Sequence, residues 1–177
     1  DHNFINLLMD HLYAGLTYKM TIDENYAQLR TIKIKRLELQ STKSTAQAQV
    51  VMTANTSNAN PVQSVTYSSP TGTGRTAIFF ESTEGVTLNV ANTTTPVSLE
   101  AMCCFVPTLS NDLTLVTTYD VCDKNGNKIA ERSASNKLPS MNVTRGECIT
   151  MTLNVNPTYL GVLSDPDLDN PTITIGN

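Results

Sequence analysis

Side chains capable of acid–base or nucleophilic chemistry are few in this chain and lie far apart. There are two histidines, His2 and His11, and both are near the N-terminus. No Gly-x-Ser-x-Gly or comparable nucleophile motif occurs, so the sequence offers no recognisable activated serine. We therefore expect no catalytic residue, and an enzyme is the least favoured class of function.

Three aspartates occupy alternate positions near the C-terminus, at Asp165, Asp167 and Asp169. This spacing resembles the start of a calcium-binding loop, where alternate carboxylates supply oxygen ligands. An EF-hand loop then needs glycine at its sixth place and glutamate at its twelfth, whereas this chain has Asn170 and Gly176 there. We therefore expect Asx-turns that order a loop, and no metal or cofactor site.

The four cysteines are Cys103, Cys104, Cys122 and Cys148. Adjacent residues of a strand point to opposite faces, so Cys103 and Cys104 cannot readily bind one metal ion together. Cys103 is expected to pack inside as a small apolar side chain. Cys122 and Cys148 fall on the polar phase of their strands, and a disulfide between them is a hypothesis that requires those strands to be neighbours.

Length and charge limit the number of domains and the kinds of partner that this chain can have. A chain of 177 residues fits one domain spanning residues 1–177. The net charge is −4, so no basic surplus exists to bind nucleic acid. No apolar run is long enough to span a bilayer as a helix. The opening DHNFINLLMD lacks the features of a signal peptide, so we expect the chain to be cytosolic or already processed.

Apolar residues at every second position are the dominant pattern, and this period is typical of half-buried strands. A single helical turn is expected at 26–29. Short strands divided by turns predict an all-β antiparallel sandwich or barrel. The expected strands are 12–22, 30–40, 46–54, 62–67, 76–81, 86–90, 97–105, 113–121, 129–133 and 149–155.

Three local features refine this pattern. The buried phase changes between Ile34 and Leu37, which predicts a β-bulge near Lys35–Arg36. The segment SSPTGTGR at 68–75 lacks the Lys-Ser/Thr ending of a phosphate-binding loop and is expected to be a flexible hairpin connection. The Asn-Gly of DKNGNK predicts a tight hairpin before 129–133.

Three segments resemble the fimbrillin-like proteins of Bacteroidetes, the subunits of major and minor fimbriae and their relatives. They are FINLLMDHLYAGLTYKMTIDENYAQLRTIKIKRLEL, TYDVCDKNGNKIAERSASNKLP and GECITMTLNVNPTYLGVLSDPDLDNPTITI. The resemblance covers most of the chain and is a resemblance of pattern, without a catalytic signature.

The resemblance implies a transthyretin-like, Greek-key β-sandwich and a structural function. Such proteins are exported, usually as lipoproteins, and reach the outer membrane, where subunits polymerise by β-strand addition. We therefore expect a non-catalytic fimbrial (pilus) subunit or cell-adhesion protein. Its partners would be other fimbrial subunits or itself, with a host or bacterial surface ligand as a further partner.

Strand addition requires a segment whose backbone pairs with an edge and whose alternate side chains fill pockets. The tail Thr172, Ile173, Thr174, Ile175 has this alternation, and Phe4–Met9, whose pattern is also that of one helical face, is the other candidate for exchange. The alternative for the tail, favoured by its place in the pattern, is an ordinary closing strand of its own domain.

A different class of function remains open, namely a surface ligand- or carbohydrate-binding β-sandwich module. Binding modules of this class use exposed aromatic side chains in a shallow site. The chain has no tryptophan, but Tyr13, Tyr67 and Tyr159 are available.

Overall fold

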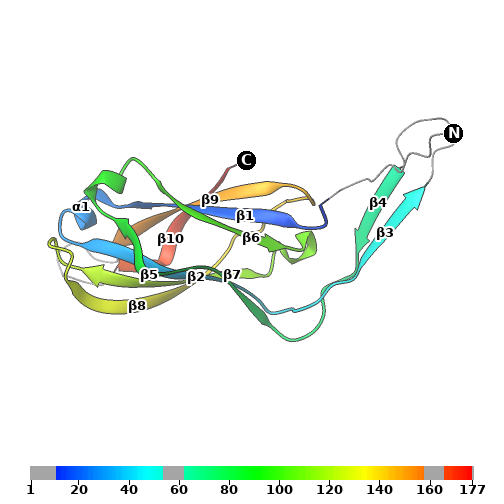
Figure 1. Cartoon of the computed structure of the whole chain (residues 1–177), viewed down its shortest axis with the longest axis horizontal. Helices are drawn as coiled ribbons and strands as arrows, with labels where there is room; N and C mark the ends of the chain where they lie inside the picture. Colours follow the sequence, from blue (N-terminus) through cyan, green and yellow to red (C-terminus); the bar gives the residue numbers. More distant parts are fainter. Residues whose placement is uncertain (1–10, 54–61, 158–165, 177) are drawn as a thin grey trace, which may run out of the picture.

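Two four-stranded sheets pack face to face, and a two-stranded ribbon projects from one end (Figure 1). The computed structural model describes residues 11–53, 62–157 and 166–176. The prediction of an all-β antiparallel sandwich is confirmed. The strands are β1 (Ala14–Ile22), β2 (Thr31–Ser41), β3 (Ala48–Thr53), β4 (Val62–Tyr67), β5 (Arg75–Leu88), β6 (Val97–Phe105), β7 (Leu113–Cys122), β8 (Lys128–Lys137), β9 (Cys148–Pro157) and β10 (Pro166–Gly176).

The strand order places distant segments beside one another. Sheet A has the order β10-β9-β1-β6, and sheet B has the order β5-β2-β7-β8. The pair β1–β9 is parallel, and the other pairs of both sheets are antiparallel. The ribbon consists of β3 and β4, which pair with each other.

The alternation read from the sequence becomes the core between the sheets. Residues of β1, β2 and β9 on the expected inward phase are buried. Each large aliphatic side chain removed from water in this way contributes about 1.5–3 kcal/mol to folding. The buried set from these strands is Ala14, Leu16, Tyr18, Met20, Ile22, Ile32, Ile34, Leu37, Leu39, Ile149, Met151, Leu153 and Val155.

The predicted bulge in β2 is confirmed. Its pairing with β7 and with β5 shifts register between Ile34 and Arg36. The extra residue, Lys35, changes the phase of the strand, so Leu37 faces the same core as Ile34.

Several of the described connections between strands contain short turns. The one-turn helix α1 (Glu24–Ala27) begins after Asp23, whose Oδ1 accepts a hydrogen bond of 3.0 Å from the backbone N–H of Tyr26. The predicted hairpin between β7 and β8 contains Gly126 at φ 83°, a conformation that glycine adopts without strain. The described residues also form two 3₁₀ turns, η1 (Val90–Asn92) and η2 (Pro107–Leu109).

The ribbon departs from the sequence-based expectation. The segment 68–75 was expected to join two strands of one hairpin, but β4 pairs with β3, whereas β5 pairs with β2 in sheet B. The predicted strand at 46–54 is present as β3, yet all six of its residues are exposed. Alternation alone therefore identified the strand but not whether its apolar face is covered.

Candidate functional site

The predicted exchange segment forms part of an edge strand. Residues Thr172 to Ile175 lie in β10, at the edge of sheet A, and pair antiparallel with β9. Ile173 lies opposite Leu153, and Ile175 lies opposite Met151. Both β9 residues are fully buried (0 % exposed). The tail therefore closes the sheet of its own chain at a strongly apolar register.

The surroundings of β10 define what its departure would uncover. On its other side β9 pairs with β1, so β9 would become the new edge of sheet A. β10 also contacts β8 of the opposite sheet. Without β10, the buried side chains of Met151 and Leu153 would lie at an open edge beside unpaired backbone groups, an arrangement that favours pairing with another strand.

The structure does not bring Cys122 and Cys148 together. Cys122 ends β7 in sheet B, Cys148 begins β9 in sheet A, and both are free thiols. Their strands are not neighbours, so the condition for the proposed disulfide is not met. Cys122 keeps the regular pairing of β7 with β2, opposite Thr31, and it is buried although it follows the inward-facing Val121.

Cys103 lies inside the sandwich, as predicted. Its side chain is 5 % exposed, whereas Cys104 faces solvent. Burial, with a smaller contribution from Cys104, raises the pKa of the Cys103 thiol to about 11. Burial likewise raises the pKa of Cys122. Both buried thiols therefore stay protonated and poorly nucleophilic at neutral pH.

The remaining predicted positions that the structure describes are not grouped into a metal centre. His11 is exposed, next to the start of β1. Phe4–Met9, Asp165 and Tyr159 lie outside the described residues. Within the described ranges, no three side chains among His, Cys, Asp and Glu are grouped to hold a metal ion.

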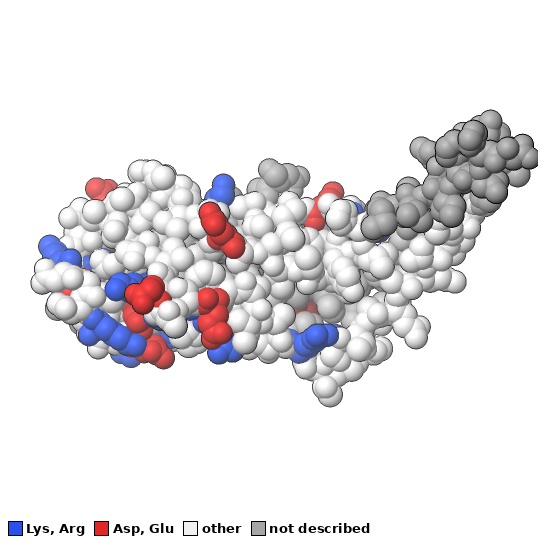
Figure 2. Space-filling view, in the orientation of Figure 1, with Lys and Arg blue, Asp and Glu red and all other residues white. Residues whose placement is uncertain are grey.

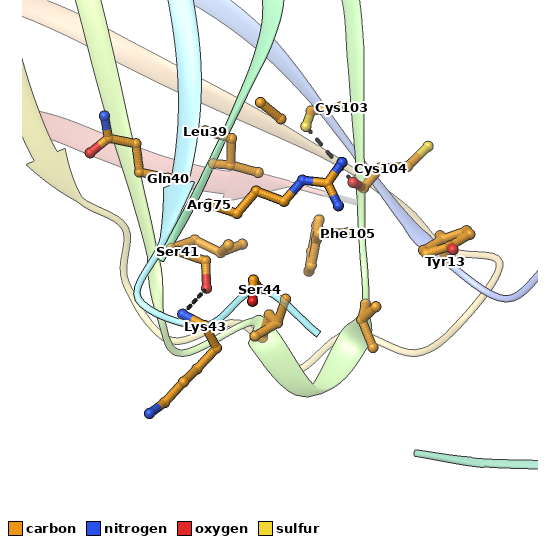
Figure 3. Close-up of a pocket in the computed structure, with 14 residues that line it drawn as sticks. Tyr13, Leu39, Gln40, Ser41, Lys43, Ser44, Arg75, Cys103, Cys104 and Phe105 are labelled. Carbon is orange, nitrogen blue, oxygen red and sulfur yellow. Dashed lines mark hydrogen bonds between the residues drawn. The ribbon is translucent and has the colours of Figure 1, made fainter. Parts of the chain in front are cut away.

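A cavity of about 250 Å³ opens at the end of the sandwich (Figure 3). Its apolar lining includes Leu39 of β2 and Cys103 and Phe105 of β6. Lys43 and Arg75 lie at its polar side, and Figure 3 shows Arg75 extending from β5 toward β6. Neither cation has an ion-pair partner among the described residues. The sequence did not signal this cavity because its walls come from separate strands.

Within the part of the chain that the structure describes, no helix is both long enough and apolar enough to cross a membrane. Comparisons of the chain with known protein families, with curated proteins and with solved structures found no match.

Proposed function

We propose that this chain is a non-catalytic, fimbrillin-like subunit of an exported surface fibre, or a related adhesin, and that it assembles by β-strand addition. The observation that carries the proposal is the order of sheet A, in which β10 lies at the edge beside β9. In this proposal the sandwich is transthyretin-like, and the fibre stands on the outer membrane as part of a fimbrium.

The physical basis is that β10 of one copy can be replaced by the same strand of another copy. If β10 of one copy leaves β9, the same strand of a second copy restores both the backbone hydrogen bonds and the apolar contacts. Burial of Ile173 and Ile175 would contribute roughly 3–6 kcal/mol before ordering costs. The main-chain hydrogen bonds of the strand add to this, so an exchanged strand can latch two subunits together, although two isoleucines alone would not hold them.

A tagged peptide of residues 166–176 tests the proposal on the full chain. We expect an adduct that survives denaturing electrophoresis without boiling. A peptide with Ile173→Asp and Ile175→Asp should not form it, because charge is placed opposite Leu153 and Met151. The matched control carries Thr172→Asp and Thr174→Asp and should retain most of the binding. Failure of the natural peptide to form any adduct would contradict strand addition by β10.

The cavity beside Arg75 favours a second candidate function, a surface ligand- or carbohydrate-binding module. Its volume of about 250 Å³ is below the usual range of about 300–1,000 Å³ for ligand pockets, so a small ligand is required. Arg75 and Lys43 favour a carboxylate on that ligand. A thermal-shift screen of acidic against neutral sugars tests this function, and the Arg75→Gln chain should lose any stabilisation by the acidic ones.

A further inference from the structure

The ribbon of β3 and β4, here called the arm, carries three consecutive exposed apolar residues. Val50, Val51 and Met52 are 42 %, 47 % and 59 % exposed. Figure 1 shows the arm extending away from the sandwich. Such a two-stranded ribbon is marginally stable in water without a third strand or another covering element.

The two faces of the arm differ in polarity. Directly opposite residues of an antiparallel pair lie on one face, and the register pairs Ala48 with Tyr67 and Val50 with Val65. Met52, which the register places opposite Gln63, continues this mainly apolar face toward the tip. The second face is the more polar one: it carries Gln49, Thr53, Ser64 and Thr66 together with Val51, and the register places Val62 opposite Thr53.

The arm also lacks the charges that usually keep free strands apart. No Asp, Glu, Lys, Arg or His occurs from Ser44 to Gly74. Figure 2 shows charged side chains on the sandwich and none on the visible face of the arm. Exposed edge strands are normally protected by charged residues or by a covering segment. An arm without charged residues and with one apolar face is therefore expected to be covered by another segment or by a partner.

One contact shows which segment begins beside the apolar face. The hydroxyl of Tyr67, whose side chain lies on that face, donates a hydrogen bond of 2.5 Å to the backbone carbonyl of Leu12. The residues that precede Leu12 in the sequence include the mainly apolar segment Phe4–Met9, which is therefore joined through the backbone to a residue at the base of the arm.

We propose that the segment Phe4–Met9 packs on the apolar face of the arm of its own chain. Six residues of strand span about 20 Å, and ten extended residues reach about 33 Å, so the segment is long enough to cover the arm. Tethering at Leu12 gives it a high effective concentration, which favours the segment of the same chain over that of a second copy. This assignment is independent of strand exchange by β10.

Amide hydrogen exchange of the full chain provides the first test. The change Leu7→Asp with Leu8→Asp should speed exchange of the β3 and β4 amides by at least about tenfold, because the cover is lost and the ribbon opens. The matched control, Asn3→Asp with Asn6→Asp, adds the same charge and should leave exchange within about twofold. Equal exchange in the Leu variant and the unchanged chain would overturn the proposal.

A cross-linking measurement separates the chain's own segment from that of another copy. Benzoylphenylalanine in place of Leu7 should, on illumination, join the segment to residues 48–53 or 65–67. In a mixture of isotopically light and heavy chains, the joined peptides should both be light or both be heavy. Mixed pairs would assign the arm to a second copy, and joining elsewhere would leave the arm without this cover; either outcome overturns the proposal.

Discussion

At the scale of single residues, burial divides the four cysteines into two reactive classes. Cys104 and Cys148 are exposed, whereas Cys103 and Cys122 are buried. We expect an alkylating reagent at pH 8 to modify Cys104 and Cys148 rapidly. The other two should react only after unfolding, because burial raises the pKa of both thiols and restricts access.

Peptide mapping of the modified cysteines measures this pattern. Cys104→Ser and Cys148→Ser chains should each lose one of the two fast-reacting thiols. Fast modification of Cys103 in the folded chain, or a Cys122–Cys148 disulfide in the mapped peptides, would contradict the structure.

Asp112 forms hydrogen bonds with the C-terminal end of β2, just before the chain enters the arm. Its carboxylate accepts hydrogen bonds from Ser41 Oγ and from the backbone N–H of Thr42, both at 2.8 Å, and from Thr42 Oγ1. The Thr42 hydroxyl is the largest cause that lowers the pKa of Asp112 from its ordinary value of 3.8, against a smaller opposing effect of burial. Charged Asp112 therefore stabilises the fold.

The change Asp112→Asn should lower the free energy of unfolding by about 1 kcal/mol at pH 7, because one charge-assisted acceptor is replaced by an amide in a solvent-screened position. A depressed pKa contributes its full stability above 3.8 and loses it as the pH falls through the lower folded value. Urea unfolding from pH 7 to pH 3 should show the difference shrinking with acidity, and a pH-independent difference would contradict this role.

At the scale of elements, the bulge of β2 lies against a glycine of β5 in an unusual conformation. Gly85 has φ +77°, and a Cβ there would meet Ile34 O and Lys33 Cβ at 3.1 Å. Gly126 in the β7–β8 hairpin has φ +83°, but nothing lies within 4 Å of its Cβ position. The two glycines therefore share a positive φ, which would strain any residue with a Cβ, and they differ in crowding.

This pair gives a matched measurement of the crowding. We expect Gly126→Ala to lower the free energy of unfolding by about 1 kcal/mol, from the positive φ alone. Gly85→Ala should lower it by about 2–3 kcal/mol, because the new methyl also presses on β2. Denaturant unfolding of both variants measures the two losses of free energy of unfolding. Equal losses would show that β2 moves away from the new methyl group without a loss of stability.

The sequence predicted elements well where local rules decide them. The bulge near Lys35 followed from a change of parity, and the β7–β8 hairpin followed from Asn125-Gly126. Prediction from the sequence failed where strand pairing depends on residues far apart in the chain. The sequence pattern predicts that the segment 68–75 connects two strands of one hairpin, whereas β5 pairs with β2. The prediction is wrong because the alternation within a strand carries no information on which strand lies beside it.

At the scale of the whole molecule, the candidate site also combines features that the sequence predicts locally with features that depend on distant strands. The tail at 172–175 was recognised as a strand from its alternation, but its place at the edge of sheet A follows from the strand order. The cavity beside Arg75 had no sequence signal, because it arises where β2, β5 and β6 converge. Alternation in β3 could not show that the arm leaves the sandwich.

The strand order of the whole molecule also predicts the kinetics of the proposed exchange. An incoming strand can pair with β9 only after β10 has left, because β1 already occupies the other side of β9. Opening of β10 therefore precedes binding, and the rate of adduct formation should level off as the concentration of the 166–176 peptide rises. The plateau is the opening rate.

Fluorescence of a labelled peptide measures this rate over a wide concentration range. Urea at ~1 M should raise the plateau, since opening exposes surface, whereas a scrambled peptide should give no signal. A rate that stays proportional to peptide concentration and does not respond to urea would mean that the peptide binds without displacing β10. The peptide would then add to an existing edge of one of the two sheets, at β10, β6, β5 or β8.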